Sequence, residues 1–182
     1  GFAAPGYSME WVRLLRPFGA GLSAVARTAP LAKVMRPLAA GLDRLAAPLA
    51  ARALGRNEDR AGAACGFDAG EDELLQAVPE LAEAFPLRPT WDAAALRWVL
   101  AHARAKEQHG PAVRRIVRGR GGRLLGCYIY FGRPRDIAWV LQILARPGAA
   151  GPVIDDLFAH AAQQGSVAVR GRAQPDLLDA LL

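Results

Sequence analysis

The sequence contains only two cysteines, and it lacks a long apolar segment. Cys65 and Cys127 show no CxxC or Cys/His ligand spacing, so the sequence predicts neither a disulfide framework nor a metal site. The longest charge-free apolar stretch near the middle, residues 137–145, is far shorter than the ~20 residues of a membrane-spanning helix. The first residues also lack the charged segment followed by an apolar segment that is typical of a signal peptide. We therefore expect a globular protein in a reducing cytoplasm.

Aromatic residues are also scarce, at 7% of the chain, whereas hydrophobic residues make up 52%. Much of the apolar content is alanine, and such small side chains suit helix packing. A length of 182 residues allows one domain of ordinary size and an appendage, but not two full domains.

The net charge of +6 is confined to one part of the chain. Residues 1–56 hold eight Lys and Arg against Glu10 and Asp43, whereas residues 57–182 hold fifteen basic and fifteen acidic side chains. A domain without net charge has no overall field that attracts a phosphate polymer. We therefore expect no nucleic-acid partner for this larger part.

Residues 1–65 differ in pattern from the rest. Residues 7–15 alternate in part, which favours a strand, and the Ala/Leu-rich segments from residue 16 onward are interrupted by four prolines. We expect several short helices in a basic connector, ending at the small and polar run of residues 56–66. Two interpretations stay open for this connector, a strap between two domains or an amphipathic element on an anionic membrane surface, and the prolines favour the strap.

The remaining residues alternate between helical and strand periodicity. Asp92 caps a predicted helix at residues 93–106, and Pro152 and Gly165 bracket another at residues 152–164. The other predicted helices are residues 72–84 and 175–182, and the predicted strands are residues 112–118, 123–132, 136–145 and 166–172. This order predicts an α/β fold with a mixed sheet, in which the strands near Val140 and Val167 are parallel and joined by a helical crossover.

Several short patterns carry a resemblance to a known family. FPLRPTW…LRWVL, GGRLLGCYIY, ILARPGAAG and GSVAVRGR resemble the second domain of bacterial tandem proteins of the GNAT (N-acetyltransferase) superfamily. The resemblance covers residues 66–182 and implies an acyl-CoA N-acyltransferase fold. The opening GF and YSMEWVRLLRP are similar to the tail of a preceding GNAT domain, so we expect residues 1–15 to be its closing strand and residues 16–65 to be the connector. We then expect a fragment that is open at both ends, with a preceding GNAT domain as partner and an incomplete sheet whose edge is unpaired.

The resemblance also implies a co-substrate site for acetyl-CoA or another acyl-CoA. In this family the pyrophosphate of CoA lies at the N-terminus of the helix that follows one of two diverging parallel strands, where free backbone N–H groups hold it. The matching residues here are Ile143, Leu144, Ala145, Arg146, Gly148, Ala149, Ala150 and Gly151. Ala149 replaces a glycine of the family pattern and Pro152 removes one donor, so a working CoA loop and a merely tight turn both stay open.

The catalytic residues are not assigned. The family commonly uses a glutamate base on the strand before the loop, where this sequence offers Gln142, and often a tyrosine acid, yet no tyrosine follows Tyr130. Two hypotheses therefore stand. Either the protein is an N-acyltransferase that acts on a small-molecule or peptide amine, or it is a non-catalytic domain that supports a catalytic preceding domain.

Other polar and aromatic residues have simpler interpretations. We expect the three histidines, His102, His109 and His160, to face solvent, and Tyr128 and Tyr130 to pack in the core. We expect Asp155 and Asp156 to compensate a helix dipole. The seven arginines from Arg114 to Arg135 suit a solvated face of the hairpin.

Overall fold

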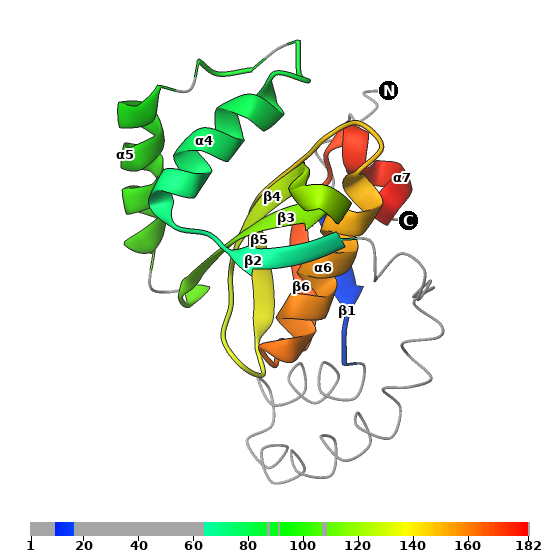
Figure 1. The fold of residues 1–182 in the computed structure, drawn as a ribbon. Helices are drawn as coiled ribbons and strands as arrows, with labels where there is room; N and C mark the ends of the chain where they lie inside the picture. Colours follow the sequence, from blue (N-terminus) through cyan, green and yellow to red (C-terminus); the bar gives the residue numbers. More distant parts are fainter. Residues whose placement is uncertain (1–9, 17–63, 87, 91, 107–108, 182) are drawn as a thin grey trace, which may run out of the picture.

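The computed structural model describes residues 10–16, 64–86, 88–90, 92–106 and 109–181. They form a mixed sheet of six strands in the order β1-β6-β5-β4-β3-β2, with helices on both faces (Figure 1). The strands are β1 (Glu10–Leu14), β2 (Ala64–Asp68), β3 (Ala112–Gly119), β4 (Leu124–Phe131), β5 (Ile137–Ala145) and β6 (Ala168–Arg172). All neighbouring strands are antiparallel except β5 and β6, which are parallel.

The helices divide the core into two layers. On one face, α4 (Glu71–Ala82) and α5 (Ala93–Arg104) pack over β3 and β4, around Leu74, Leu100 and Ile129. On the other face, α6 (Ala150–Gln163) crosses the sheet and buries Leu157 against both tyrosines of β4. The short η4 (Arg120–Gly122), η5 (Pro175–Leu177) and α7 (Leu178–Leu181) complete the elements. No helix in the described ranges is both long and apolar enough to cross a membrane.

The local signals in the sequence act as predicted. Asp92 caps α5, because its Oδ1 accepts a hydrogen bond of 2.6 Å from the amide of Ala95. Gly165 follows α6 with φ of 85°, a left-handed conformation that glycine adopts at little cost. The predicted α/β class, the mixed sheet and the parallel pair joined by a helix are confirmed.

The two ends of the sheet differ from expectation. β2 was not predicted, and its residues 64–66 fall in the segment expected to be a boundary. β1 lies within the predicted strand of residues 7–15, of which residues 7–9 are outside the described part, and it pairs with β6. β1 therefore occupies the edge of the sheet beside β6. The expected connector falls almost wholly on residues 17–63, outside the described residues.

β5 is less buried than its apolar sequence predicts. Trp139 and Leu141 keep 38% and 42% of their surface exposed, because α4 and α5 cover β3 and β4 but leave this part of the sheet open. Ala138 and Ile143 face the other way and are buried under α6. One face of β5 is thus accessible at the centre of the sheet.

Candidate functional site

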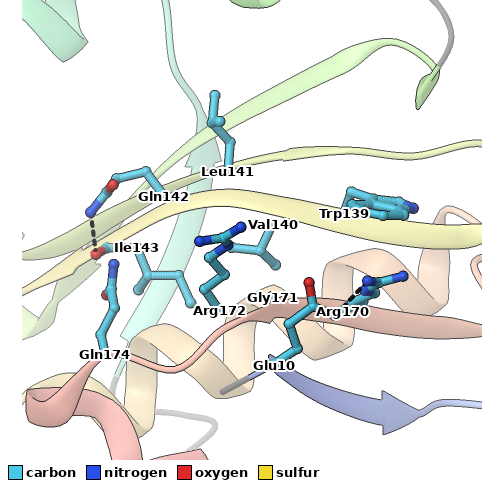
Figure 2. A pocket seen from close by; sticks show the side chains of 10 residues that line it. All are labelled: Glu10, Trp139, Val140, Leu141, Gln142, Ile143, Arg170, Gly171, Arg172 and Gln174. Atoms are coloured by element: carbon cyan, nitrogen blue, oxygen red, sulfur yellow. Dashed lines mark hydrogen bonds and ion pairs between the residues drawn. The ribbon is translucent and has the colours of Figure 1, made fainter. Parts of the chain in front are cut away.

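β5 and β6 separate partway along their length, and a cavity lies where they do. Their parallel pairing begins at Ile137 with Ala168 and ends at Trp139 with Arg170. Beyond that point a cavity of about 320 Å³ opens between the strands (Figure 2). Its lining comes from β1, β5, β6 and the residues after β6: Glu10, Trp139, Val140, Leu141, Gln142, Ile143, Arg170, Gly171, Arg172 and Gln174.

A β-bulge in β5 shapes this cavity. Ile129 of β4 pairs with Gln142, whereas the next residue, Tyr130, pairs with Val140, so Leu141 is an extra residue without a partner in β4. The bulge lets both Leu141 and Gln142 be exposed and line the cavity. The main chain of residues 140–143 also has no register partner in β6. Within the described part of the chain, its N–H and C=O groups on that side are therefore available to a bound molecule, apart from the Ile143 carbonyl, which accepts from Gln142.

The turn from β5 into α6 leaves open space in front of backbone donors. Gly148 has φ of 78°, and a Cβ at Gly148 or at Gly151 would meet no atom of the described residues within 4 Å. Among the described residues, the amides of Ala150 and Gly151 have no acceptor, as expected for the first turn of a helix. Pro152 lacks an N–H group. In the described part of the chain, the space in front of Gly148 and Gly151 is thus open, although none of residues 146–151 lines the cavity.

Arg146, which we expected near a phosphate, is held by the protein. Its Nε donates a hydrogen bond of 2.9 Å to the carbonyl of Leu124, and its Nη2 forms an ion pair with Glu80 of α4. Of the other predicted residues, Ile143 lines the cavity and Leu144 packs toward α4 and α5. Arg146 therefore fixes the end of β5 to α4 in this structure.

The charged side chains of the cavity are unevenly paired. Glu10 and Arg170 form an ion pair, and the Arg170 guanidinium lies 4.2 Å from the centre of the Trp139 ring, in a cation–π contact. The guanidinium of Arg172 has no acceptor among the described residues. Gln142 donates from Nε2 to the carbonyl of Ile143 at 3.1 Å (Figure 2).

The wall contributed by β1 is anchored by an aromatic residue. Trp11 lies opposite Gly171, and its Nε1 donates a hydrogen bond of 3.1 Å to the carbonyl of Arg172. The indole also packs edge-on against Phe158 of α6, with 5.9 Å between the ring centres. Arg16 donates to the carbonyl of Ala162 near the end of α6 at 3.0 Å. These contacts hold Glu10 at the cavity, a position that sequence analysis missed because β1 is remote in the chain.

A polar network lies under α6, away from the cavity. Tyr128 donates a hydrogen bond of 2.6 Å to Asp156, whose other oxygen accepts from the amide of Gly66 at 3.1 Å. Nε of Arg115 lies 3.5 Å from Oδ2 of Asp156, and its Nη1 forms an ion pair of 2.9 Å with Oδ1 of Asp68. Burial, reinforced by Asp156, raises the pKa of Tyr128 far above its usual range. The dipole role expected for Asp156 is wrong, since α6 begins at Ala150 and has no acidic residue in its first turn.

The histidines fall in three environments. His102 is exposed and stacks on Trp98 at 5.5 Å, as a solvent-facing residue should. His109 is half-buried, 5.2 Å from the ring of Trp139. His160 was expected in solvent but is buried, with Nδ1 2.9 Å from the hydroxyl of Tyr130. Burial, together with the positive charge of Arg115, lowers the pKa of His160.

The remaining predictions on polar residues are partly confirmed. Tyr128 and Tyr130 are fully buried, as expected for core residues. Five of the seven hairpin arginines are exposed, whereas Arg114 and Arg115 are half-buried. In the described ranges, no group of three or more His, Cys, Asp or Glu side chains could hold a metal ion.

Comparison with known proteins gives a likeness of fold. No protein-family model matches the chain, and no curated protein is similar to it in sequence. A conserved protein of unknown function from Bacteroides thetaiotaomicron is 12% identical, with a TM-score of 0.50, over 98% of this chain and 56% of that one. An acetyltransferase from Trypanosoma brucei is 18% identical over 64% of this chain and 87% of that one, with a TM-score of 0.44. Glucosamine-6-phosphate N-acetyltransferase from Arabidopsis thaliana is 8% identical over 62% of this chain and 84% of that one, and its TM-score is also 0.44.

Proposed function

We propose that this protein is an N-acyltransferase of the GNAT type, which transfers an acyl group from acetyl-CoA or another acyl-CoA to an amine. The observation that carries the proposal is the separation of the parallel strands β5 and β6 after Trp139 and Arg170, with a cavity between them. An open helix N-terminus follows β5 directly, at Ala150 and Gly151. A thioester in the cavity and a diphosphate at the helix would suit these two features.

The proposed reaction is a direct displacement. The amine nitrogen attacks the thioester carbonyl carbon, the C–N bond forms, the C–S bond breaks, and the thiolate of CoA leaves and takes up a proton. The main chain of residues 140–143, which has no register partner on the side of β6, can hold the thioester part by backbone hydrogen bonds. The cavity thus contributes chiefly by placing the two reactants side by side.

The amine must lose a proton in this reaction, so a proton acceptor is required. Gln142 cannot ionise, and Glu10 of β1 is the carboxylate among the residues that line the cavity. We assign proton removal to Glu10. On this hypothesis the N-terminal strand supplies a group that the family more commonly carries on the strand preceding the loop.

The test measures co-substrate binding and transfer separately. Titration of the full chain with acetyl-CoA should release heat and saturate, and desulfo-CoA should compete with it. In a thiol-release assay, acetyl-CoA with a panel of amines should yield free CoA faster than without protein. An absence of binding at millimolar acetyl-CoA would remove the proposal.

A second candidate is a non-catalytic domain that supports a preceding domain in a longer chain. Arg146 favours it, because an arginine that Glu80 neutralises offers no free charge to a phosphate. Pro152 favours it too, since it removes a donor from the first turn of α6. An absence of turnover across the panel of amines, with or without binding of acetyl-CoA, would support this candidate over the enzyme.

A further inference from the structure

We propose that the acceptor amine also carries a carboxylate, and that Arg172 binds this carboxylate in the cavity between β5 and β6. The inference rests on the proposed acyl transfer and names the substrate class of the same site. It would make the acceptor an amino acid or a similarly small zwitterion.

The first support is the charge of the cavity. Glu10 lies opposite Arg172 in the register of β1 and β6, yet its carboxylate binds Arg170, the diagonal neighbour. Within the described part of the chain, Arg172 is left without a counter-ion. The three ionised groups of the lining therefore sum to one positive charge. A simple alkylammonium ion would be repelled by this charge, whereas a zwitterion can offset it with its carboxylate.

The second support is the placement of the donors. Arg170, Arg172 and Gln174 alternate with the buried Gly171 and Ala173, and Gln174 keeps an extended backbone with φ of −116° and ψ of 131°. The three long side chains therefore share the face away from α6. Figure 2 shows Arg172 and Gln174 extending from the β6 side of the cavity toward β5. A guanidinium and a neighbouring carboxamide can both donate to one carboxylate.

The third support separates this anion from the diphosphate of CoA. Residues 146–151, at the open turn before α6, do not line the cavity. A phosphate monoester also carries about −1.5 to −2 charges at neutral pH, more than one unpaired guanidinium offsets. A cavity of about 320 Å³ fits a small molecule, and its apolar lining by Val140 and Leu141 fits a hydrocarbon side chain.

The experiment compares two acceptors that differ only in the carboxylate, L-leucine and 3-methylbutylamine, at fixed acetyl-CoA. We expect the wild-type KM for L-leucine to be about 10- to 100-fold below that for 3-methylbutylamine. Arg172→Met should raise the KM for L-leucine by about tenfold or more and remove most of this preference, and Arg172→Lys should retain part of it. The matched control Arg120→Met, in the exposed hairpin turn, should leave the preference unchanged.

Three results would overturn the proposal: equal KM values for the two acceptors, a preference that survives in Arg172→Met, or tighter binding of 2-aminoethyl phosphate than of L-leucine. Calorimetric titration of each acceptor without acetyl-CoA separates this proposal from the proposed function. Binding of L-leucine that depends on Arg172, in a chain that does not bind acetyl-CoA, would keep the carboxylate site and reject the acyltransferase. Binding of acetyl-CoA without discrimination between the acceptors would do the reverse.

Discussion

Trp11 and Gly171 lie directly opposite each other in β1 and β6, so close that a Cβ on Gly171 would stand 2.7 Å from Cζ2 of the indole. The glycine leaves the space in which the indole crosses β6 and reaches Phe158. The absence of one side chain thus lets β1 occupy the sheet edge and bring Glu10 to the cavity.

Gly171→Ala should therefore weaken the docking of β1. Overpacking against the indole predicts a loss of about 1–3 kcal/mol in the free energy of unfolding. In a Trp11→Ala background the clash is gone, so the same substitution should cost less than about 0.5 kcal/mol. Denaturant unfolding of the four proteins of this cycle measures the coupling. Equal costs in both backgrounds would show that the two residues are not in contact.

Gly151→Glu should separate stability from co-substrate binding. The new side chain enters open space at the start of α6, where glutamate is a better helix former than glycine and suits the positive end of the dipole. We expect a midpoint of thermal unfolding equal to or above that of the wild type, with acetyl-CoA affinity reduced about tenfold or more. Gly151→Ala is the matched control and should keep most of the affinity. Unchanged binding in Gly151→Glu would place the diphosphate elsewhere.

Asp156→Ala should lower the free energy of unfolding by more than the loss of a helix-dipole interaction can explain. It removes the acceptor of Tyr128 and of the Gly66 amide, so we expect a loss of about 2–4 kcal/mol in the free energy of unfolding. Asp155→Ala, at the exposed neighbouring position, should cost less than about 1 kcal/mol. Chemical denaturation of both variants checks this, and similar costs would contradict the structural role of Asp156.

His160 should make the protein less stable in mild acid. Its folded-state pKa lies below the ordinary value of 6.5, so the unfolded chain takes up the proton first. The loss of stability therefore begins as pH falls through about 6.5 and is complete below the lowered folded-state pKa. Arg115, Asp68 and Asp156 act on this group, and burial is the largest cause. Unfolding free energies measured between pH 5 and 7.5 should fall less steeply on acidification in His160→Gln, and identical slopes would refute the assignment.

Glu10→Gln should slow acyl transfer without preventing co-substrate binding. The amide keeps the size of the side chain but cannot take a proton, so kcat should fall about 10²- to 10⁴-fold while the affinity for acetyl-CoA stays within about twofold. Arg170→Met tests the other half of the ion pair, and it should alter KM more than kcat. A kcat unchanged in Glu10→Gln would assign proton removal to another group or to water.

The fold could be predicted where signals are local. Asp92, Gly165 and the turn at Gly121, with φ of 73°, each fix a boundary through their own backbone chemistry. β2 was not predicted because its five residues, ACGFD, include small and polar side chains and show no clear alternation of apolar and polar residues. Its stability comes from pairing with β3 and from Asp156, which are contacts with distant segments.

The candidate site could be predicted only in part. The strand-turn-helix of residues 143–151 follows from neighbouring residues, whereas the docking of Glu10 beside Arg170 joins segments 160 positions apart. The bulge at Leu141 was not predicted either, because an extra residue in an apolar strand does not change the sequence pattern of that strand. His160 could have been found, since it follows Leu157 by three positions and so shares the buried stripe of α6.

The most direct test of the account is to locate acetyl-CoA on the full chain by amide chemical-shift changes. The account predicts saturable changes concentrated at residues 140–143 of β5 and at Gly148, Ala150 and Gly151 before and within α6, with smaller changes at β2. Saturable binding whose changes cluster away from β5 and the start of α6, or no change at millimolar acetyl-CoA, would contradict it.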